Sequence, residues 1–272
     1  MSICRAVARL ALVEAIRGNT SVGANVFDSL IGGLDFDLNG SVSTSEEKPF
    51  AAVYSDTAMV EAGDIADCGY HANGATMFII EFGIAAAMFQ AASDDSGERE
   101  IAETGLAATD DNLEFSLDLL TRQIMDTIVD PENVWSTIFR DMLHSVSKLE
   151  RSRIGNDGDG IRLAGQQIRI TGALLADPAK GAVIDSESPL AAFFVLAAAS
   201  GNADLAGKAA LLEQTMSGEI ADLALLQRMT AMTNQTVAAL GLNPLDAQAP
   251  DMVLNEAVIG MPQGGEQVVT ND

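Results

Sequence analysis

The sequence predicts an α+β fold, with an antiparallel or mixed sheet flanked by helices and a C-terminal helical extension. Three observations lead to this prediction. Apolar residues recur at three- and four-residue spacing in residues 3–16, which is the period of an amphipathic helix. Residues 76–86 alternate between two faces, as the residues of a strand do. Strand-like and helix-like segments are grouped along the chain instead of alternating, which favours an α+β fold.

The N-terminal part predicts one helix and three strands. The helix covers residues 3–16, and Gly18 stands where a C-terminal cap is expected. Residues 25–28 and 50–54 are short strands rich in Val, Phe and Tyr, and a polar loop joins them. The strand over residues 76–86 directs four large apolar side chains to one face: Phe78, Ile80, Phe82 and Ile84.

The middle of the chain predicts two helices after an acidic loop over residues 91–111. The first helix, over residues 110–127, has an apolar stripe made by Leu113, Leu117, Leu120, Ile124 and Ile128. Asp130 followed by Pro131 has the pattern of an N-cap and a first helical residue. The helix that begins there is expected to bury Val134, Trp135, Ile138, Phe139 and Met142.

Residues 145–154 and 161–173 predict a pair of strands around the turn GNDGDG, with a bulge at Gly165. Residues 140–169 are also the one mildly basic region of the sequence. Six cations stand there beside Asp141, Glu150, Asp157 and Asp159: Arg140, Lys148, Arg151, Arg153, Arg162 and Arg169. Two interpretations remain open. The region is an exposed hairpin with ion pairs across its strands, or a surface that docks an acidic neighbour such as another copy of this chain.

We expect an α+β domain over residues 1–177 and a helical hairpin extension with an extended C-terminal arm over residues 178–272. The helix boundaries of the extension are marked by caps, Pro and Gly at Ser188, Pro189, Gly201, Asn202, Gly241 and Pro244. The tail from residue 244 onward contains three Pro and several Gly, which predicts an arm or a loosely ordered segment.

Composition and charge limit the function. The chain has 272 residues, of which 48% are hydrophobic, and this is enough to bury a substantial core. The 15 Lys and Arg against 39 Asp and Glu give a formal net charge of -24, which disfavours bulk binding to DNA or to anionic membranes. Cys4 and Cys68 stand far apart, so we expect reduced thiols in a protein made in the cytoplasm. No segment is long and apolar enough to predict a membrane span.

No pattern predicts a reaction or a metal site. Cys68 and His71 are the one close pair of soft ligands, whereas a structural zinc site needs about four. Paired acids stand at Asp35 and Asp37, Asp94 and Asp95, Asp110 and Asp111, and Asp157 and Asp159. The first and last pairs have calcium-loop spacing, but turns explain them better because no bidentate Glu follows. The two middle pairs resemble paired catalytic carboxylates, but loop and helix-cap residues explain them better. We expect no cofactor, metal or catalytic residue, and a hydrolase that uses an Asp pair is kept as an alternative.

Two short motifs carry a resemblance to a known family. The first has the pattern T-x-x-G-x-x-V-F-D-S, at Thr20, Gly23, Val26, Phe27, Asp28 and Ser29. The second has the pattern P-x-x-x-V-Y-x-D, at Pro49, Val53, Tyr54 and Asp56. Over residues 1–175 the chain resembles the tail terminator (tail completion) proteins of long-tailed bacteriophages. Leu30 departs from the pattern, because a basic residue is expected after the D-S pair.

The resemblance implies a structural virion protein that catalyses no reaction. Such proteins form rings, usually hexamers, that cap the tail tube and offer a joining surface to a head-completion or neck protein. The resemblance therefore implies a homo-oligomer at the neck-proximal end of the tail, made in the host cytoplasm. DNA is expected to pass through its lumen without specific binding. The candidate interface residues are Phe27, Asp28, Leu30, Tyr54, Asp56, Lys148, Arg151, Arg153 and Arg162.

A physical role for the motifs follows from their position. Alternating apolar residues are expected to fix two strands on the core, and Asp28 and Asp56 to end those strands by accepting backbone hydrogen bonds. The loop between the strands is expected to stay exposed to a neighbouring subunit. Three alternatives stay open: another neck, connector or minor tail protein; a hydrolase; and a soluble host-side binding module.

Overall fold

The computed structural model describes residues 2–30, 35–36, 42–43, 48–61, 69–85, 89–91, 99–101, 110–156, 163–217, 227, 232–239, 256–260 and 266–270. The chain forms two compact units, Met1–Ala231 and Met232–Asp272. The first unit holds a mixed sheet and its helices, so the predicted α+β class is confirmed. The domain boundary that we expected at residue 177 lies inside this first unit, because the helices that follow pack on the rest of it.

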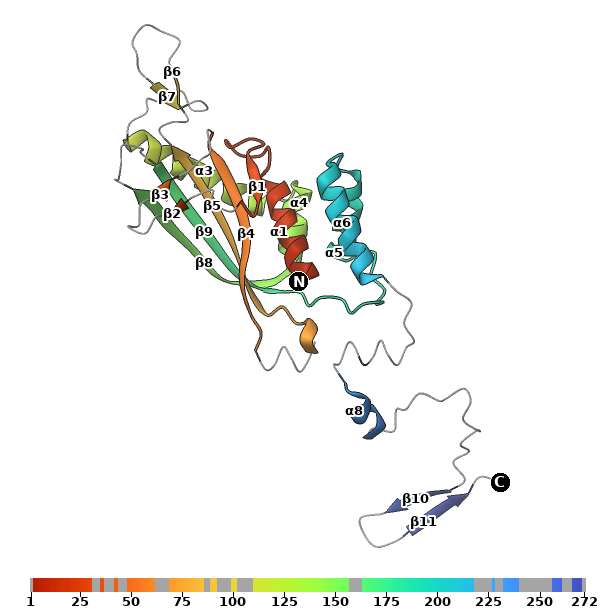
Figure 1. The fold of residues 1–272 in the computed structure, drawn as a ribbon. Helices are drawn as coiled ribbons and strands as arrows, with labels where there is room; N and C mark the ends of the chain where they lie inside the picture. The colour runs from red at the N-terminus through yellow and green to blue at the C-terminus, as the bar shows by residue number, and fades with distance from the viewer. Residues whose placement is uncertain are drawn as a thin grey trace. The chain divides into compact units, whose positions relative to one another are not determined.

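Within the described residues, the main sheet has five strands in the order β1-β4-β5-β9-β8 (Figure 1). They are β1 (Val26–Asp28), β4 (Phe50–Met59), β5 (Ala75–Ala85), β8 (Leu143–Asn156) and β9 (Leu163–Leu174). Strand β1 runs parallel to β4, and the other neighbours are antiparallel, which makes the sheet mixed. The five predicted strand regions are therefore confirmed, although β4 runs five residues beyond its predicted end.

Two short antiparallel strand pairs of the first unit were not predicted. Strands β2 (Asp35–Phe36) and β3 (Val42–Ser43) pair within the expected polar loop. Strands β6 (Phe89–Ala91) and β7 (Arg99–Ile101) pair around a stretch that we read as an acidic loop. Both pairs lie in sequence with little apolar periodicity, so the sequence gives no strong strand signal there.

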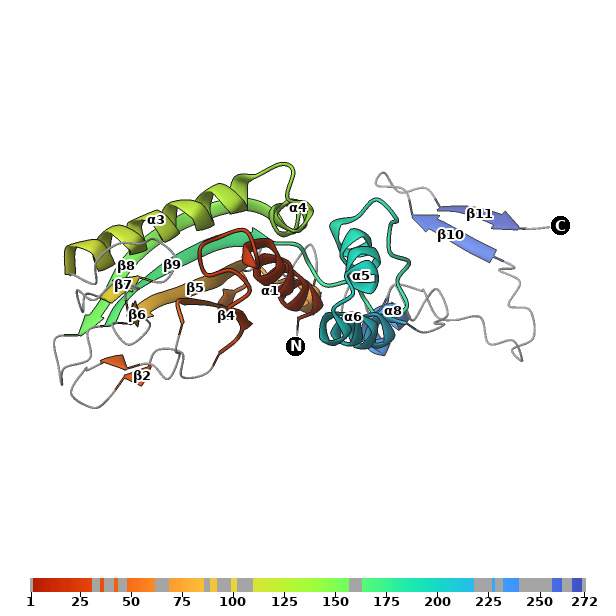
Figure 2. The same ribbon diagram turned by 90° about the horizontal axis from the view of Figure 1, so that it is seen from above.

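Helices pack on one face of the main sheet (Figure 2). They are α1 (Ile3–Ile16), α3 (Asp110–Val129) and α4 (Val134–Asp141). A helical hairpin made of α5 (Pro189–Ala199) and α6 (Ala203–Met216) extends this layer, because α5 packs against α1 and α4. The predicted inner face of β5 is confirmed, because Phe78, Ile80 and Phe82 are fully buried beneath the helices. Ten of the fourteen residues of α1 are buried, since β4, α3, α4 and α5 surround this helix.

Aromatic rings join the layers of the first unit. The rings of Phe78 in β5 and Phe139 in α4 meet edge to face with their centroids 5.5 Å apart. Trp135 of α4 and Phe193 of α5 meet at 6.0 Å. The α5–α6 hairpin is therefore part of the main core, and its predicted caps are confirmed: Ser188 accepts from the Ala191 amide and Asn202 from the Leu205 amide.

Two local predictions in the middle of the chain are wrong. Helix α4 is capped by Asn133, which accepts from the Ser136 amide at 3.1 Å, whereas Asp130 accepts from Glu132 in the preceding turn. Because the helix therefore begins three residues beyond Pro131, Val134 lies in its first turn and is 57% exposed instead of buried.

The bulge expected at Gly165 is also absent, since Gly165 pairs regularly with Gly83 and Ile154. The irregularities of the β8–β9 ladder lie between Leu143 and Ser145 and between Val146 and Lys148. In each case β8 has one residue more than β9 opposite it.

The second unit contains α8 (Asn234–Ala239) and an antiparallel pair, β10 (Glu256–Gly260) and β11 (Glu266–Thr270). The tail that we predicted as an extended arm therefore contains a strand pair. The predicted helix ends at Gly241 and Pro244 lie outside the described residues. Within the part of the chain that the structure describes, no helix has both the length and the apolar character needed to cross a membrane.

Candidate interface and the Asp28 cluster

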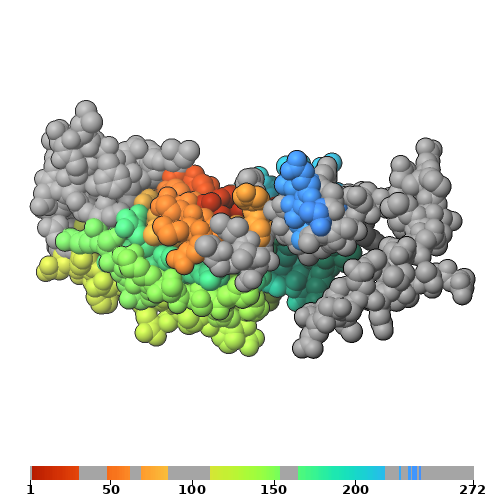
Figure 3. All heavy atoms as spheres, turned by 90° about the horizontal axis from the view of Figure 1, so that it is seen from below, coloured from red at the N-terminus to blue at the C-terminus, as the bar shows by residue number. Residues whose placement is uncertain are grey.

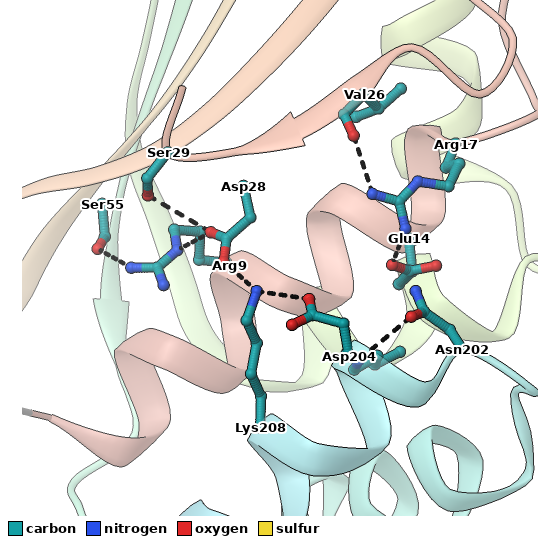
Figure 4. Close-up of polar contacts among 11 residues, drawn as sticks. Arg9, Glu14, Arg17, Val26, Asp28, Ser29, Ser55, Asn202, Asp204 and Lys208 are labelled. Atoms are coloured by element: carbon teal, nitrogen blue, oxygen red, sulfur yellow. Dashed lines mark hydrogen bonds and ion pairs between the residues drawn. The ribbon is translucent and has the colours of Figure 1, made fainter. Parts of the chain in front are cut away.

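Asp28, one of the predicted interface residues, is the centre of a polar cluster formed with Arg9 and Lys208 (Figure 4). Arg9 Nε of α1 donates to Asp28 Oδ1 at 2.5 Å, and Lys208 Nζ of α6 donates to Asp28 Oδ2 at 3.3 Å. Lys208 Nζ also lies 2.9 Å from Asp204 Oδ2, one turn earlier in α6. The Asp28 cluster thus joins β1, α1 and α6 through one carboxylate.

The backbone leaves regular strand geometry directly after Asp28. Strand β1 ends at Asp28, and Ser29 then has a φ of 59°, which is unusual for a residue other than Gly. The Ser29 amide donates to the Val53 carbonyl at 2.9 Å. In the described part of the chain, the Asp28 carboxylate accepts from side chains of Arg9, Lys208 and Ser29, whereas we expected it to accept from backbone amides.

The charges of the cluster are partly shielded from water. The side chains of Arg9 and Asp28 are 21% and 16% exposed, and that of Lys208 is 41% exposed. The hydrogen bond to Asp204 raises the pKa of Lys208 above its ordinary value, and Asp28 acts in the same direction against the effect of desolvation. The protonated ammonium is therefore the form that the folded chain favours.

A second set of contacts closes the outer edge of β1. Arg17 forms an ion pair with Glu14 and donates through Nη2 to the Val26 carbonyl at 2.8 Å. Residues of α1, β1 and α6, including the half-buried Phe27, line a cavity of about 200 Å³ beside this edge. The β1 edge of the sheet is thus covered by side chains and by the α5–α6 hairpin.

The remaining candidates of the two motifs lie near the same edge. Tyr54 donates its hydroxyl to the Leu30 carbonyl at 2.5 Å, and burial, with the charge of Glu81 nearby, raises the pKa of Tyr54. Asp56 does not end β4, because the strand continues to Met59 through an irregularity between Ser55 and Ala58. The Asp56 side chain is exposed, while its carbonyl accepts from Arg5 Nη2 at 2.7 Å.

The basic candidates lie on β8, at the opposite edge of the sheet from β1. Figure 3 shows the green atoms of this part of the chain apart from the red and orange atoms of the N-terminal part. Lys148, Arg151 and Arg153 are all exposed. Lys148 pairs with Glu150 of the same strand at 2.9 Å, and Arg153 pairs with Glu114 of α3 at 2.9 Å. The observed pairs thus run within β8 and from β8 to α3, instead of across the strands. Arg162 lies outside the described residues.

A groove of about 410 Å³ separates β8 from α3. Arg151 lines it on the strand side, and residues of α3 line the other side, including Asp118, Arg122 and Asp126. The motif residues near β1 and the cations of β8 are therefore not brought together within one chain. The first set lies on and beside β1, and the second lies on β8 at the opposite edge of the sheet.

The residues considered for metal or catalytic chemistry are not gathered into a site in the described ranges. His71 lies in a short 3-10 helix, η1 (Gly69–His71), and Cys68 lies outside the described residues. No group of three or more His, Cys, Asp or Glu residues suited to a metal occurs among the residues that the structure describes. Cys4 is a buried free thiol, and burial followed by the charge of Asp177 raises the pKa of this thiol.

Asp177 is a structural residue that the sequence analysis read only as a boundary. Its carboxylate accepts from the amides of Ile3 and Cys4 at 3.1 and 2.9 Å, from Ser2 Oγ at 2.9 Å and from Asn73 Nδ2 at 3.1 Å. It therefore supplies acceptors to the N-terminus of α1 from 173 or more residues away. No local pattern in the sequence signals such a distant cap.

No model of a protein family matches the chain, and no curated protein matches it.

Proposed function

We propose that this protein is a structural component of a bacteriophage virion, a tail terminator that forms a ring on the tail tube. The observation that best supports the proposal is the difference between the two edges of the sheet. Arg17 and α6 cover the β1 edge, whereas β8 carries exposed cations at the other edge. Two unlike surfaces allow head-to-tail contacts, and such contacts close into a ring when the rotation between subunits permits it.

Charge supports the same arrangement. Because the chain has a net charge of -24, most approaches between two copies are repulsive. Lys148 and Arg151 provide an edge that attracts acidic side chains of a neighbour, and Asp56 is an exposed acid near the other edge. The ring contact proposed here sets Asp56 and its surroundings against β8 of the next subunit, with about 1,000 Å² or more buried in each contact.

The mechanism of termination is geometric. One face of the ring matches the surface that a tube subunit offers to the next ring, and the opposite face does not, so stacking stops. The opposite face is then available to a neck or head-completion protein. The strong negative charge lets DNA slide through the lumen, since it repels the phosphate backbone.

Deleting the protein from an assembling virus tests the proposal. We expect tails of uncontrolled length, or tails that are not joined to heads, when the virions are viewed by electron microscopy. Tails of normal length that carry heads would reject termination as the function. A protein needed elsewhere in the neck would give normal tail length without head attachment, which separates the nearest alternative.

A charge reversal tests the proposed contact. The double change Lys148→Glu with Arg151→Glu is expected to abolish ring formation on purified tubes, because it turns the β8 surface acidic. Lys180→Glu is the matched control, since Lys180 is an exposed cation away from β8. Equal ring formation by the two variants would contradict the role of β8.

A further inference from the structure

Helix α3 has a second stripe on the side that faces away from the core. Phe115, Leu119 and Val129 are exposed at 59%, 38% and 60% of their surface. Between them, Arg122 Nε and Asp126 Oδ2 form an exposed ion pair at 2.7 Å. At about 100° per residue, these five positions are centred about 180° from the buried stripe of the same helix.

The spacing of this outer stripe is that of a helix–helix seam. Positions 115, 119, 122, 126 and 129 follow each other at intervals of four and three residues, as core positions of coiled coils do. They cover about 21 Å of helix, from the rise of about 1.5 Å per residue. Single exposed apolar residues are common on protein surfaces, but here three of them lie in seam register on one side of one helix, with the Arg122–Asp126 ion pair between them.

The outer stripe is complementary to itself in one orientation. In an antiparallel pair of α3 helices related by a two-fold axis near residue 124, Arg122 lies opposite Asp126 of the second copy. Leu119 then lies opposite Val129 of the second copy, and the same two contacts repeat on the other side of the axis. A parallel pair in register places Arg122 against Arg122 and Asp126 against Asp126, which is unfavourable.

We propose that α3 is a dimerisation surface whose partner is α3 of a second copy in this antiparallel arrangement. Charge favours this occupant, because two chains of net charge -24 approach with least repulsion where the surface is locally neutral. The outer stripe contains one cation and one anion, and the adjoining groove adds Asp118 and Arg151, which also balance. The proposal does not rest on the proposed function. The five positions of the outer stripe are not assigned to the ring contact, whereas Arg151 of the adjoining groove belongs to both surfaces.

Charge-swap variants of the full-length protein test the seam. Sedimentation velocity from about 1 to 200 μM is expected to show a monomer–dimer equilibrium, since a seam of this size is at the weak end of specific interfaces. Arg122→Asp and Asp126→Arg each place like charges together at two points of the dimer, and we expect each to weaken it by about tenfold or more. The double variant restores unlike pairs at both points, so we expect its dissociation constant to return to within about threefold of the unmodified chain.

The double variant also keeps an ion pair of i,i+4 spacing within α3, so circular dichroism is expected to show unchanged helix content. Leu119→Ser is expected to dissociate the dimer, whereas Val183→Ser, at a residue that is 97% exposed outside α3, is the matched control and leaves it intact. A monomer at every concentration would overturn the proposal. It would also fail if the single variants weakened the dimer and the double variant did not restore it. A larger ring unaffected by these variants would leave the proposed function standing and reject the α3 seam.

Discussion

Replacing Asp28 by Ala tests whether the Asp28 cluster holds the first unit together. The change removes the carboxylate that Arg9 and Lys208 share, while both cations stay close to each other. Hydrogen bonds to charged groups contribute about 1.5–3 kcal/mol each, and breaking a fully buried ion pair costs about 3–5 kcal/mol. Because Asp28 and Arg9 are 16% and 21% exposed, we expect Asp28→Ala to lower the free energy of unfolding by about 2 kcal/mol.

Lys208 gives the internal comparison for this prediction. Its side chain is 41% exposed and keeps Asp204 as a partner, so Lys208→Ala is expected to cost less than about 1 kcal/mol. Urea unfolding followed by circular dichroism measures both changes, provided that the slope against urea stays constant. Asp56→Ala is the matched control, because this carboxylate is exposed. If Asp28→Ala and Asp56→Ala had equal effects, Asp28 would be a surface residue and the reasoning would be wrong.

Three further predictions concern the same unit. Asp177→Ala removes the acceptor of three donors at the start of α1 and of Asn73 Nδ2, and it is expected to cost about 3 kcal/mol in urea unfolding. Gly74 has a φ of +54°, and Gly74→Ala places a Cβ 2.1 Å from a backbone carbonyl oxygen of β4, so this change is expected to prevent folding or to cost more than about 3 kcal/mol. Gly18 is the comparison: it has a φ of +75° but lies in open space, so Gly18→Ala is expected to cost about 1 kcal/mol. In a Tyr70→Phe chain, Tyr54 is the remaining Tyr, and an absorbance titration is expected to show it ionising above its ordinary pKa of 10.0. The stability that the neutral phenol of Tyr54 gives is complete below pH 10.0 and is lost as the pH rises through the pKa of the folded state. Ionisation at the ordinary pKa would contradict the burial of Tyr54.

The elements that the sequence predicts well are those with a regular apolar period. The stripe of α3 from Leu113 to Ile128 is buried at every expected position, and Phe78, Ile80 and Phe82 face the helices from β5. Their prediction succeeds because local periodicity alone decides which side of a long helix or a central strand must be buried. The helix boundaries at Ser188 and Asn202 succeed for a similar reason, since an N-cap acts within three residues.

Predictions that depend on competing local signals fare less well. Asp130 and Asn133 are both able to cap a helix, and the choice falls on Asn133, whose amide also donates to the Ala15 carbonyl of α1 at 3.0 Å. That second contact is tertiary and lies 118 residues away, so the local sequence does not contain it. The bulges of β8 are missed because they depend on the register against β9 and not on any residue of unusual backbone freedom.

The candidate site is predicted in position but not in its contacts. The motifs correctly place Asp28 at the end of a strand, yet its cationic partners come from residues 19 and 180 positions away. A carboxylate in an acidic chain has few cations available, and only the packing of α6 beside β1 determines which cation it meets. The outer stripe of α3 is also present in the sequence, as positions at intervals of four and three residues. Only the inner stripe was predicted, because all five of its positions are apolar, whereas the outer stripe includes Arg122 and Asp126.

The build of β8 indicates what kind of contact this edge makes. A bare edge strand is a template for pairing with another chain, and proteins protect such edges with bulges and charged side chains. Strand β8 has both, since its ladder is irregular at two places before Lys148 and its regular part carries Lys148, Arg151 and Arg153. Continuous main-chain pairing with a neighbour is therefore disfavoured over the first part of the strand. We expect a neighbouring subunit to contact this edge through acidic side chains, which makes the contact sensitive to salt, as main-chain pairing is not.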